Sequence, residues 1–202
     1  MLVVIPRILI IKSVSCSNQY GKCGDELQES LENIGGKSLK DTKEIIEEMV
    51  SKNLFVKEYS YRYVIPDKIA IYLIIKKAKY ILQNSNNNFF ALVDEDGMVL
   101  GYGENSTLPG VVFSGDTIAI GESISEKQHF SLDLISSMYY YYQVKKGIMT
   151  EDGLEVRMPD GITVIFPLEG DRDVLLGGLR VVLSKIERIS TIDLRFKNPV
   201  LK

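Results

Sequence analysis

The strongest constraint on the fold is the pattern of the last quarter of the chain, which alternates between extended and helical signals. Residues 161–166 form a β-branched and aromatic run that is typical of a strand. Residues 171–187 place apolar side chains at helical spacing, at Leu175, Leu179, Val182, Leu183 and Ile186. Residues 192–196 are again extended. This order predicts a helix that covers a sheet, and a chain that ends on an edge strand at residues 191–201.

Two further elements are predicted in the middle of the chain. Asp96-Gly97 lies between the apolar runs of residues 92–100 and predicts a hairpin, because glycine accepts the positive φ of a tight turn. Residues 126–142 read as a helix, with a capping-box spacing from Ser123 to Glu126 and one apolar face that carries Ile135, Met138 and Tyr142.

The stretch from Ile8 to Ile75 reads as strand, helix, helix, strand, strand. Ile8 to Ile11 is a β-branched run, and residues 25–33 form a short helix that ends at Gly35-Gly36. Ser38 caps a second helix that ends near Asn53 and buries Ile45, Ile46, Met49 and Val50. Two strands follow around Pro66-Asp67-Lys68, and the second has a period-two pattern through Ile69, Ile71, Leu73 and Ile75.

A polar stretch at residues 83–88 separates this unit from the residue-92 hairpin. Its Gln, Asn and Ser composition suits a linker. The chain has 202 residues, of which 45% are hydrophobic, so it can form two small cores. We therefore expect an α+β protein with a βααββ domain at residues 6–82 and a second domain at residues 83–202.

These patterns together resemble the FtsQ/DivIB family of bacterial cell-division proteins. Residues 192–196 match the family's terminal "iDLRf" strand, residues 92–99 its "LVDxxGxV" hairpin, and Leu108-Pro109 the step that commonly follows it. The resemblance implies a POTRA domain at 6–82 and a C-terminal β domain at 83–202, with an antiparallel-rich sheet, helices on one face and a terminal edge strand. Residues 76–79, Lys-Lys-Ala-Lys, depart from the family's Glu-x-x-Pro.

The resemblance also implies a function. Such a chain is a noncatalytic scaffold that links division proteins at the septum, and its last strand docks an FtsB/DivIC-type partner, itself paired with an FtsL-like protein, by β-augmentation. The POTRA domain helps to recruit other divisome components. The expected docking residues are Asp193, Arg195 as a ligand for a partner carboxylate, Phe196 as an aromatic anchor, Lys197, Asn198 and Val200. Pro199 lacks the N–H of a ladder and shortens the pairing. The alternative is a POTRA-containing secretion or outer-membrane assembly component that binds client strands.

Charge and hydropathy bear on location. Residues 1–82 hold 13 basic and 10 acidic residues, a balance of +3, and the remainder holds 11 and 17, a balance of −6. The first charge is compatible with an anionic membrane surface, whereas a pI near 5.4 without a basic aromatic stripe argues against nucleic acid. Residues 1–5 are too short to span a bilayer, and no signal peptide is evident. By the resemblance, we expect a single-pass membrane protein whose N-terminal helix is missing from this chain, with both domains extracytoplasmic.

Cys16 and Cys23, the two cysteines, flank a predicted loop between the first strand and the first helix. They suit either a disulfide in an oxidising compartment or two free thiols. Two thiols and one distant histidine are too few for a structural zinc, so no metal site is predicted.

No catalytic group is predicted. Gly35-Gly36-Lys37-Ser38 lacks the upstream glycine and preceding strand of a phosphate-binding loop. His129 is the only histidine and is expected at a helix surface. The acidic clusters at residues 94–96 and 169–173 lie at turns, where carboxylates cap helices. We expect neither an enzyme nor a cofactor.

Overall fold

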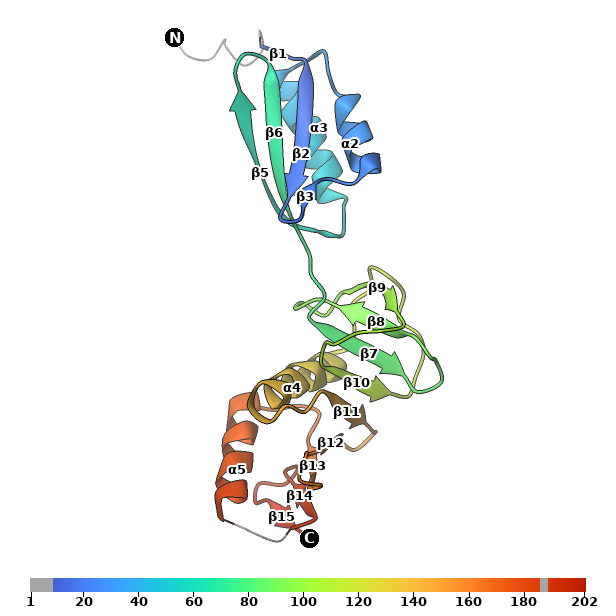
Figure 1. The fold of residues 1–202 in the computed structure, drawn as a ribbon, viewed down its shortest axis with the longest axis vertical. Helices are drawn as coiled ribbons and strands as arrows, with labels where there is room; N and C mark the ends of the chain where they lie inside the picture. The colour runs from blue at the N-terminus through green and yellow to red at the C-terminus, as the bar shows by residue number, and fades with distance from the viewer. Residues whose placement is uncertain (1–8, 186–188) are drawn as a thin grey trace. The chain divides into compact units, whose positions relative to one another are not determined.

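The computed structural model describes residues 9–185 and 189–202 and divides the chain into two compact units, Met1–Lys76 and Lys77–Lys202 (Figure 1). The expected boundary, between residues 82 and 83, falls inside a strand of the second unit, β7 (Tyr80–Asn84). The polar residues 85–88 are the loop that follows this strand. Composition alone misplaced the boundary, because a polar turn within a sheet has the same residue types as a linker.

The first unit is a four-stranded sheet with two helices. Its elements are β1 (Ile10–Ile11), β2 (Ser13–Asn18), β3 (Gly21–Lys22), α2 (Asp25–Glu32), β4 (Lys37–Ser38), α3 (Leu39–Ser51), β5 (Val56–Val64) and β6 (Lys68–Ile75). The sheet order is β3-β2-β6-β5, with β2 parallel to β6 and β5 antiparallel to it. The short strands β1 and β4 form a separate antiparallel pair.

Both helices of this unit lie on one face of the sheet (Figure 1). The period-two pattern of β6 is confirmed, because Ile69, Ile71 and Leu73 are buried in the core. In α3, Ile46 and Val50 are buried, while Ile45 and Met49 pack at the margin of the core. The Ser38 side chain accepts a hydrogen bond from the backbone N of Asp41, which confirms the expected cap.

The first sheet strand lies later in the chain than expected. Ile10–Ile11 forms only the short β1, and Ile8 lies outside the described residues. The strand that pairs with β6 is β2, in which Val14 and Cys16 are buried and the intervening serines face away from the helices. Its three serines lower the strand propensity of this segment. It forms a strand because its backbone pairs with β6, and not because of its local propensity.

The segment between the two cysteines, expected as a loop, is largely a hairpin, because β2 extends through Asn18 and pairs with β3. The structure joins Cys16 to Cys23, which precedes α2, in a disulfide with a Cα–Cα distance of 5.4 Å. Both cysteines are buried beneath α2 in the first core.

The second unit is built on a nine-stranded mixed sheet. Its elements after β7 are β8 (Phe90–Val93), β9 (Val99–Gly103), β10 (Gly110–Phe113), α4 (Glu126–Tyr142), β11 (Lys146–Met149), β12 (Leu154–Arg157), β13 (Thr163–Phe166), α5 (Arg172–Lys185), β14 (Thr191–Asp193) and β15 (Val200–Leu201). The strand order is β15-β14-β13-β12-β11-β10-β7-β8-β9. Five of its eight strand pairs are antiparallel. The α+β class is confirmed.

The two helices of this unit and one face of its sheet share a single core. Leu132, Leu134, Ile135 and Met138 of α4 are buried in it. The helix begins after Ser125, whose capping box uses Gln128, so the expected pair Ser123 and Glu126 was wrong. The N-cap is the residue at which the backbone enters the helix, and residue type alone does not determine that position.

Helix α5 uses the expected stripe and one further residue. Leu179 is buried, Leu175, Val182 and Leu183 are partly buried against the core, and Leu176 is buried although it was not predicted. Ile186, predicted as part of the stripe, lies outside the described residues.

The hairpin predicted at Asp96-Gly97 is confirmed. β8 and β9 pair antiparallel across this turn, and Gly97 has φ +84°.

Candidate protein-docking site

The C-terminal segment forms a small hairpin instead of one edge strand. β14 pairs with β13 on one side and with β15 on the other, so its edge is occupied. Residues 195–198 form the bend between β14 and β15. The expected edge strand at 191–201 is thus corrected: within this segment only β15, two residues long, lies at an edge of the sheet, and β9 forms the opposite edge.

Asp193 and Arg195 bind each other at the end of β14. The Arg195 Nε and Nη2 atoms lie 2.9 Å and 2.6 Å from the two carboxylate oxygens of Asp193, and the Arg195 backbone N donates to the same carboxylate at 3.1 Å. The guanidinium hydrogen bonds hold the pKa of Asp193 below its usual range. Arg195 is therefore already paired with Asp193, and its expected role as the ligand for a partner carboxylate is not supported.

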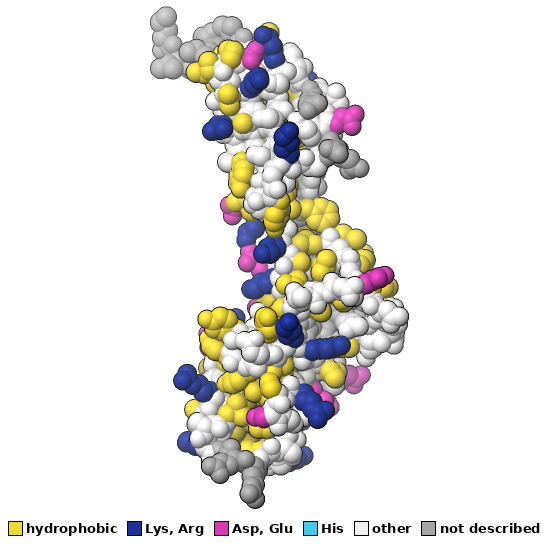
Figure 2. Space-filling model, viewed as in Figure 1, with side chains coloured by type: hydrophobic (Ala, Val, Ile, Leu, Met, Phe, Trp, Pro, Cys, Tyr) yellow, Lys and Arg dark blue, Asp and Glu magenta, His cyan; other side chains and the backbone are white. Residues whose placement is uncertain are grey.

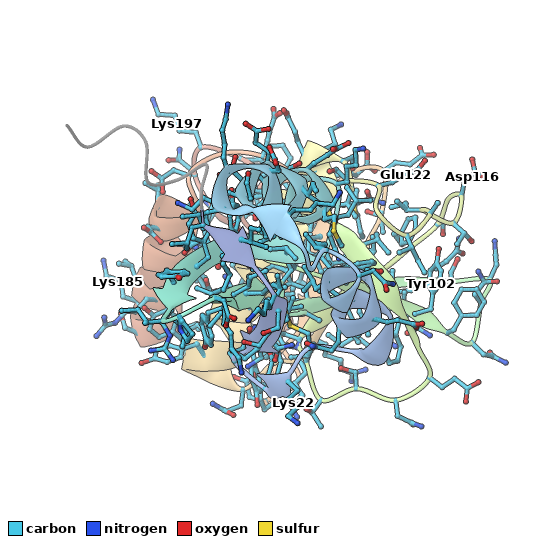
Figure 3. The ribbon with its side chains drawn as sticks, turned by 90° about the horizontal axis from the view of Figure 1, so that it is seen from above. Lys22, Tyr102, Asp116, Glu122, Lys185 and Lys197 are labelled. Atoms are coloured by element: carbon cyan, nitrogen blue, oxygen red, sulfur yellow. A yellow bond between two sulfur atoms is a disulfide. The ribbon has the colours of Figure 1, made fainter. Side chains whose placement is uncertain are left out.

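The rest of the bend presents the other expected residues to solvent. The Phe196 side chain is 58% exposed, and the Arg195 guanidinium lies 5.8 Å from its ring centroid. Lys197 and Asn198 are exposed, and Lys197 points away from the molecule (Figure 3). Val200 on β15 is 40% exposed. The structure thus brings Phe196, Lys197, Asn198 and Val200 to one exposed hairpin.

The backbone of β15 offers a short docking edge. Thr191 and Lys202 exchange two N–H···O hydrogen bonds, of 3.1 Å and 3.0 Å. In an antiparallel ladder, the next residue along, Leu201, directs its N–H and C=O away from β14. Pro199 alternates with Leu201 and has no N–H to offer on the same side. Leu201, whose side chain is also 40% exposed, was missed by sequence analysis.

The four-stranded sheet of the first unit has a longer exposed edge. β5 lies at the end of the strand order and is nine residues long. Its tyrosines and valines mark it as a strand, and its charged residues Lys57, Glu58 and Arg62 could have marked it as an edge. Tyr59 and Tyr63 are 40% and 38% exposed.

A groove of about 830 Å³ lies along α4 and α5. It is lined by aromatic and cationic side chains and by a helix glycine, namely Tyr141, Tyr142, Arg172, Asp173, Leu176, Gly177 and Arg180. Arg172 Nε binds the Asp173 carboxylate at 3.1 Å, whereas Arg180 has no hydrogen bond or ion pair among the described residues. Sequence analysis did not bring these two helices together.

The histidine and the acidic turns, the candidates for chemistry in the sequence, make structural contacts. His129 Nε2 lies 2.9 Å from the Glu95 backbone oxygen, and the His129 ring packs beside Gly97. The Asp171 carboxylate accepts hydrogen bonds from the backbone N atoms of Asp173 and Val174 at 2.8 Å and 3.1 Å, which caps α5. Within residues 9–185 and 189–202 the structure shows no acidic, histidine and cysteine group that could hold a metal ion.

Comparison with known proteins adds no family. No protein-family model and no curated protein matches the chain. In the described part of the chain, none of the helices has the length and apolar character needed to cross a membrane.

Proposed function

We propose that this chain is a noncatalytic docking protein of the bacterial division machinery, whose C-terminal hairpin binds an extended segment of an FtsB/DivIC-type partner. The observation that carries the proposal is a sheet edge with exposed apolar side chains, Phe196, Val200 and Leu201. Exposed apolar residues beside a free strand edge are the features that β-augmentation requires.

The hairpin geometry changes how the partner binds. The edge offers the N–H and C=O of Leu201 and little more backbone, so side chains must supply most of the affinity. Phe196 is the aromatic anchor. Arg195 holds the bend through Asp193 and orients Phe196. Lys197, which has no ion pair with any described residue, supplies a cation for an acidic group of the partner.

The first unit fits the same proposal as a POTRA domain that contacts further divisome components, including an FtsL-like protein. Its disulfide supports an extracytoplasmic location at the cell membrane, because such bonds persist in oxidising compartments.

Calorimetric titration with the C-terminal extracytoplasmic segment of the FtsB/DivIC-type partner tests the docking site. Phe196→Ala is expected to weaken binding by about tenfold or more, and Phe89→Ala, at a partly exposed phenylalanine of the same unit, is the matched control. Leu201→Pro removes the outward N–H and should weaken binding more than Leu201→Ala. Equal affinity of all four variants and the wild type, or no binding at all, would refute this site.

A second candidate function rests on the β5 edge. Its nine residues would suit a secretion or assembly component that binds client strands, since β-augmentation gains affinity with the number of main-chain bonds. Hydrogen exchange with the division partner separates the two edges. Protection of Leu201 supports docking at the hairpin, and protection confined to residues 56–64 would place the binding of an extended segment at β5 instead.

A further inference from the structure

One end of the first unit exposes aliphatic side chains on a protruding turn. Ile65, in the turn from β5 to β6, is 83% exposed, and Tyr63 and Val64 beside it are 38% and 36% exposed. Ile10 is 57% exposed. Ile10 lies at the same end of the unit as Ile65. Lys12, two positions after Ile10, donates its backbone N–H to the backbone oxygen of Asp67, which is in the same turn as Ile65, at 2.8 Å.

Lysines surround these apolar residues. Lys12 directly precedes β2, and Lys68 is the first residue of the paired strand β6. Lys37 pairs in register with Ile11, and Lys40 is in the first turn of α3. Figure 2 shows hydrophobic and basic side chains, with an acidic side chain among them, at this end of the unit. Lys12 binds Asp67 at 2.8 Å and Lys40 binds Glu44 at 3.5 Å. Lys37 and Lys68 have no ion pair among the described residues.

We propose that this end of the first unit binds the surface of a bilayer that contains anionic phospholipid. Ile65 and Ile10 enter the boundary between headgroups and acyl chains, and Tyr63 lies at headgroup level. The ammonium groups of Lys37 and Lys68, which are not held in ion pairs among the described residues, contact lipid phosphates. This surface is separate from the C-terminal hairpin, so it adds a membrane contact to the proposed docking function without depending on it.

The shape of the surface favours a bilayer over a protein groove. Ile65, the most exposed large apolar residue among those described, projects from a turn that follows a long strand, and lysines flank it on neighbouring elements. An apolar tip with a cationic border matches the arrangement of a bilayer, whose apolar interior lies beneath a negatively charged surface.

A tryptophan placed at the tip tests the contact directly. The chain has no tryptophan, so Ile65→Trp introduces a single fluorescent probe. The 202-residue chain with Ile65→Trp is mixed with vesicles of equal parts phosphatidylglycerol and phosphatidylcholine. A blue shift of its emission, with quenching by brominated lipid, is expected. Leu54→Trp is the matched control. Leu54 is 54% exposed and lies just before Val56, at the end of β5 opposite to Ile65.

Vesicle co-sedimentation gives the affinity. Ile65→Asp should weaken binding by at least about tenfold, and high salt should weaken the wild type. The proposal is overturned if the wild type does not bind, if Leu54→Trp shifts as much as Ile65→Trp, or if the chain binds while Ile65→Trp keeps its emission. The last outcome would assign binding to another segment, such as residues 1–8. None of these results alters the titration that tests the hairpin.

Discussion

The Arg195 guanidinium binds the carboxylate of Asp193 through two nitrogens, at 2.9 Å and 2.6 Å, although the residues are only two positions apart. With the Arg195 backbone N at 3.1 Å, three donors of one residue meet one carboxylate. This contact closes the end of β14 and starts the bend that carries Phe196. An arginine that reads in the sequence as a partner ligand is therefore an internal support of the hairpin.

Replacing Asp193 with asparagine is expected to destabilise the second unit by about 1–3 kcal/mol, because a charged hydrogen-bond acceptor in a nearly buried position is lost. Urea unfolding measures the change. Asp116→Asn, at an exposed loop residue, is the control and should leave the midpoint unchanged.

The same pair has a pH signature. Because the Arg195 hydrogen bonds lower the pKa of Asp193, the stabilisation is complete above the unfolded-state pKa, near 3.8, and is lost as the pH falls through the lower folded-state pKa. The stability difference between wild type and Asp193→Asn should therefore shrink as the pH is lowered from about 5 toward 2. A difference that stays constant over this range would contradict the pairing.

Tyr80 should make the second unit sensitive to alkali. Its side chain is fully buried and its hydroxyl donates to the Asp133 carboxylate, so burial first and then this hydrogen bond raise the Tyr80 pKa. The folded state then keeps a proton that the unfolded chain loses above pH 10.0, and stability falls as the pH rises beyond that value. Tyr80→Phe should lower stability at neutral pH by about 1–2 kcal/mol and reduce the alkaline loss. Tyr141→Phe, which is exposed, should show neither effect.

Reduction of the disulfide should destabilise the first unit selectively. The cysteines are seven positions apart, and closing a loop of this length contributes about 2.5 kcal/mol in the chain-entropy model. Denaturant unfolding with and without dithiothreitol measures it. The double variant Cys16→Ala, Cys23→Ala should be insensitive to the reductant, and a shift in the second unit's transition would contradict the assignment.

Gly110→Ala is expected to disrupt the centre of the nine-stranded sheet. A Cβ at this residue of β10 would lie 2.1 Å from Ile81 Cγ1 and 2.3 Å from the Ile81 backbone oxygen on β7. A loss of about 3 kcal/mol or more, or failure to fold, follows from this backbone clash. Gly101→Ala in β9 is the control, because nothing lies within 4 Å of its Cβ position, and it should fold normally.

Gly177→Ala should have the opposite sign. This glycine is within α5, and nothing lies within 4 Å of the added Cβ. Alanine restricts the unfolded chain and favours helix, so the second unit should gain about 0.5–1 kcal/mol. Thermal unfolding measures the gain. A loss of stability would mean that α5 packs more closely around Gly177 than the structure shows.

Local patterns predicted most elements of this chain, and long-range pairing explains where they failed. α4 matches its predicted range, residues 126–142, because the spacing of its apolar residues is a local signal. The Asp96-Gly97 hairpin is likewise encoded within a few residues. By contrast, β2 is serine-rich and is a strand because β6 pairs with it, and β15 is a strand because β14 does.

The sequence by itself determined the helices, the Asp96-Gly97 turn, the alternation of β6 and the presence of an extended segment near Arg195, because these signals depend on residues close together in the chain. Only the tertiary structure decided which strand is an edge and which groups the predicted docking residues contact. β14 is interior because the chain turns back and β15 pairs with it. Arg195 is paired because the backbone bends directly after β14 and this bend places its guanidinium against Asp193. Whether a strand is an edge depends on which distant strand pairs with its backbone N–H and C=O groups, and an ion pair depends on how the folded backbone directs the two side chains.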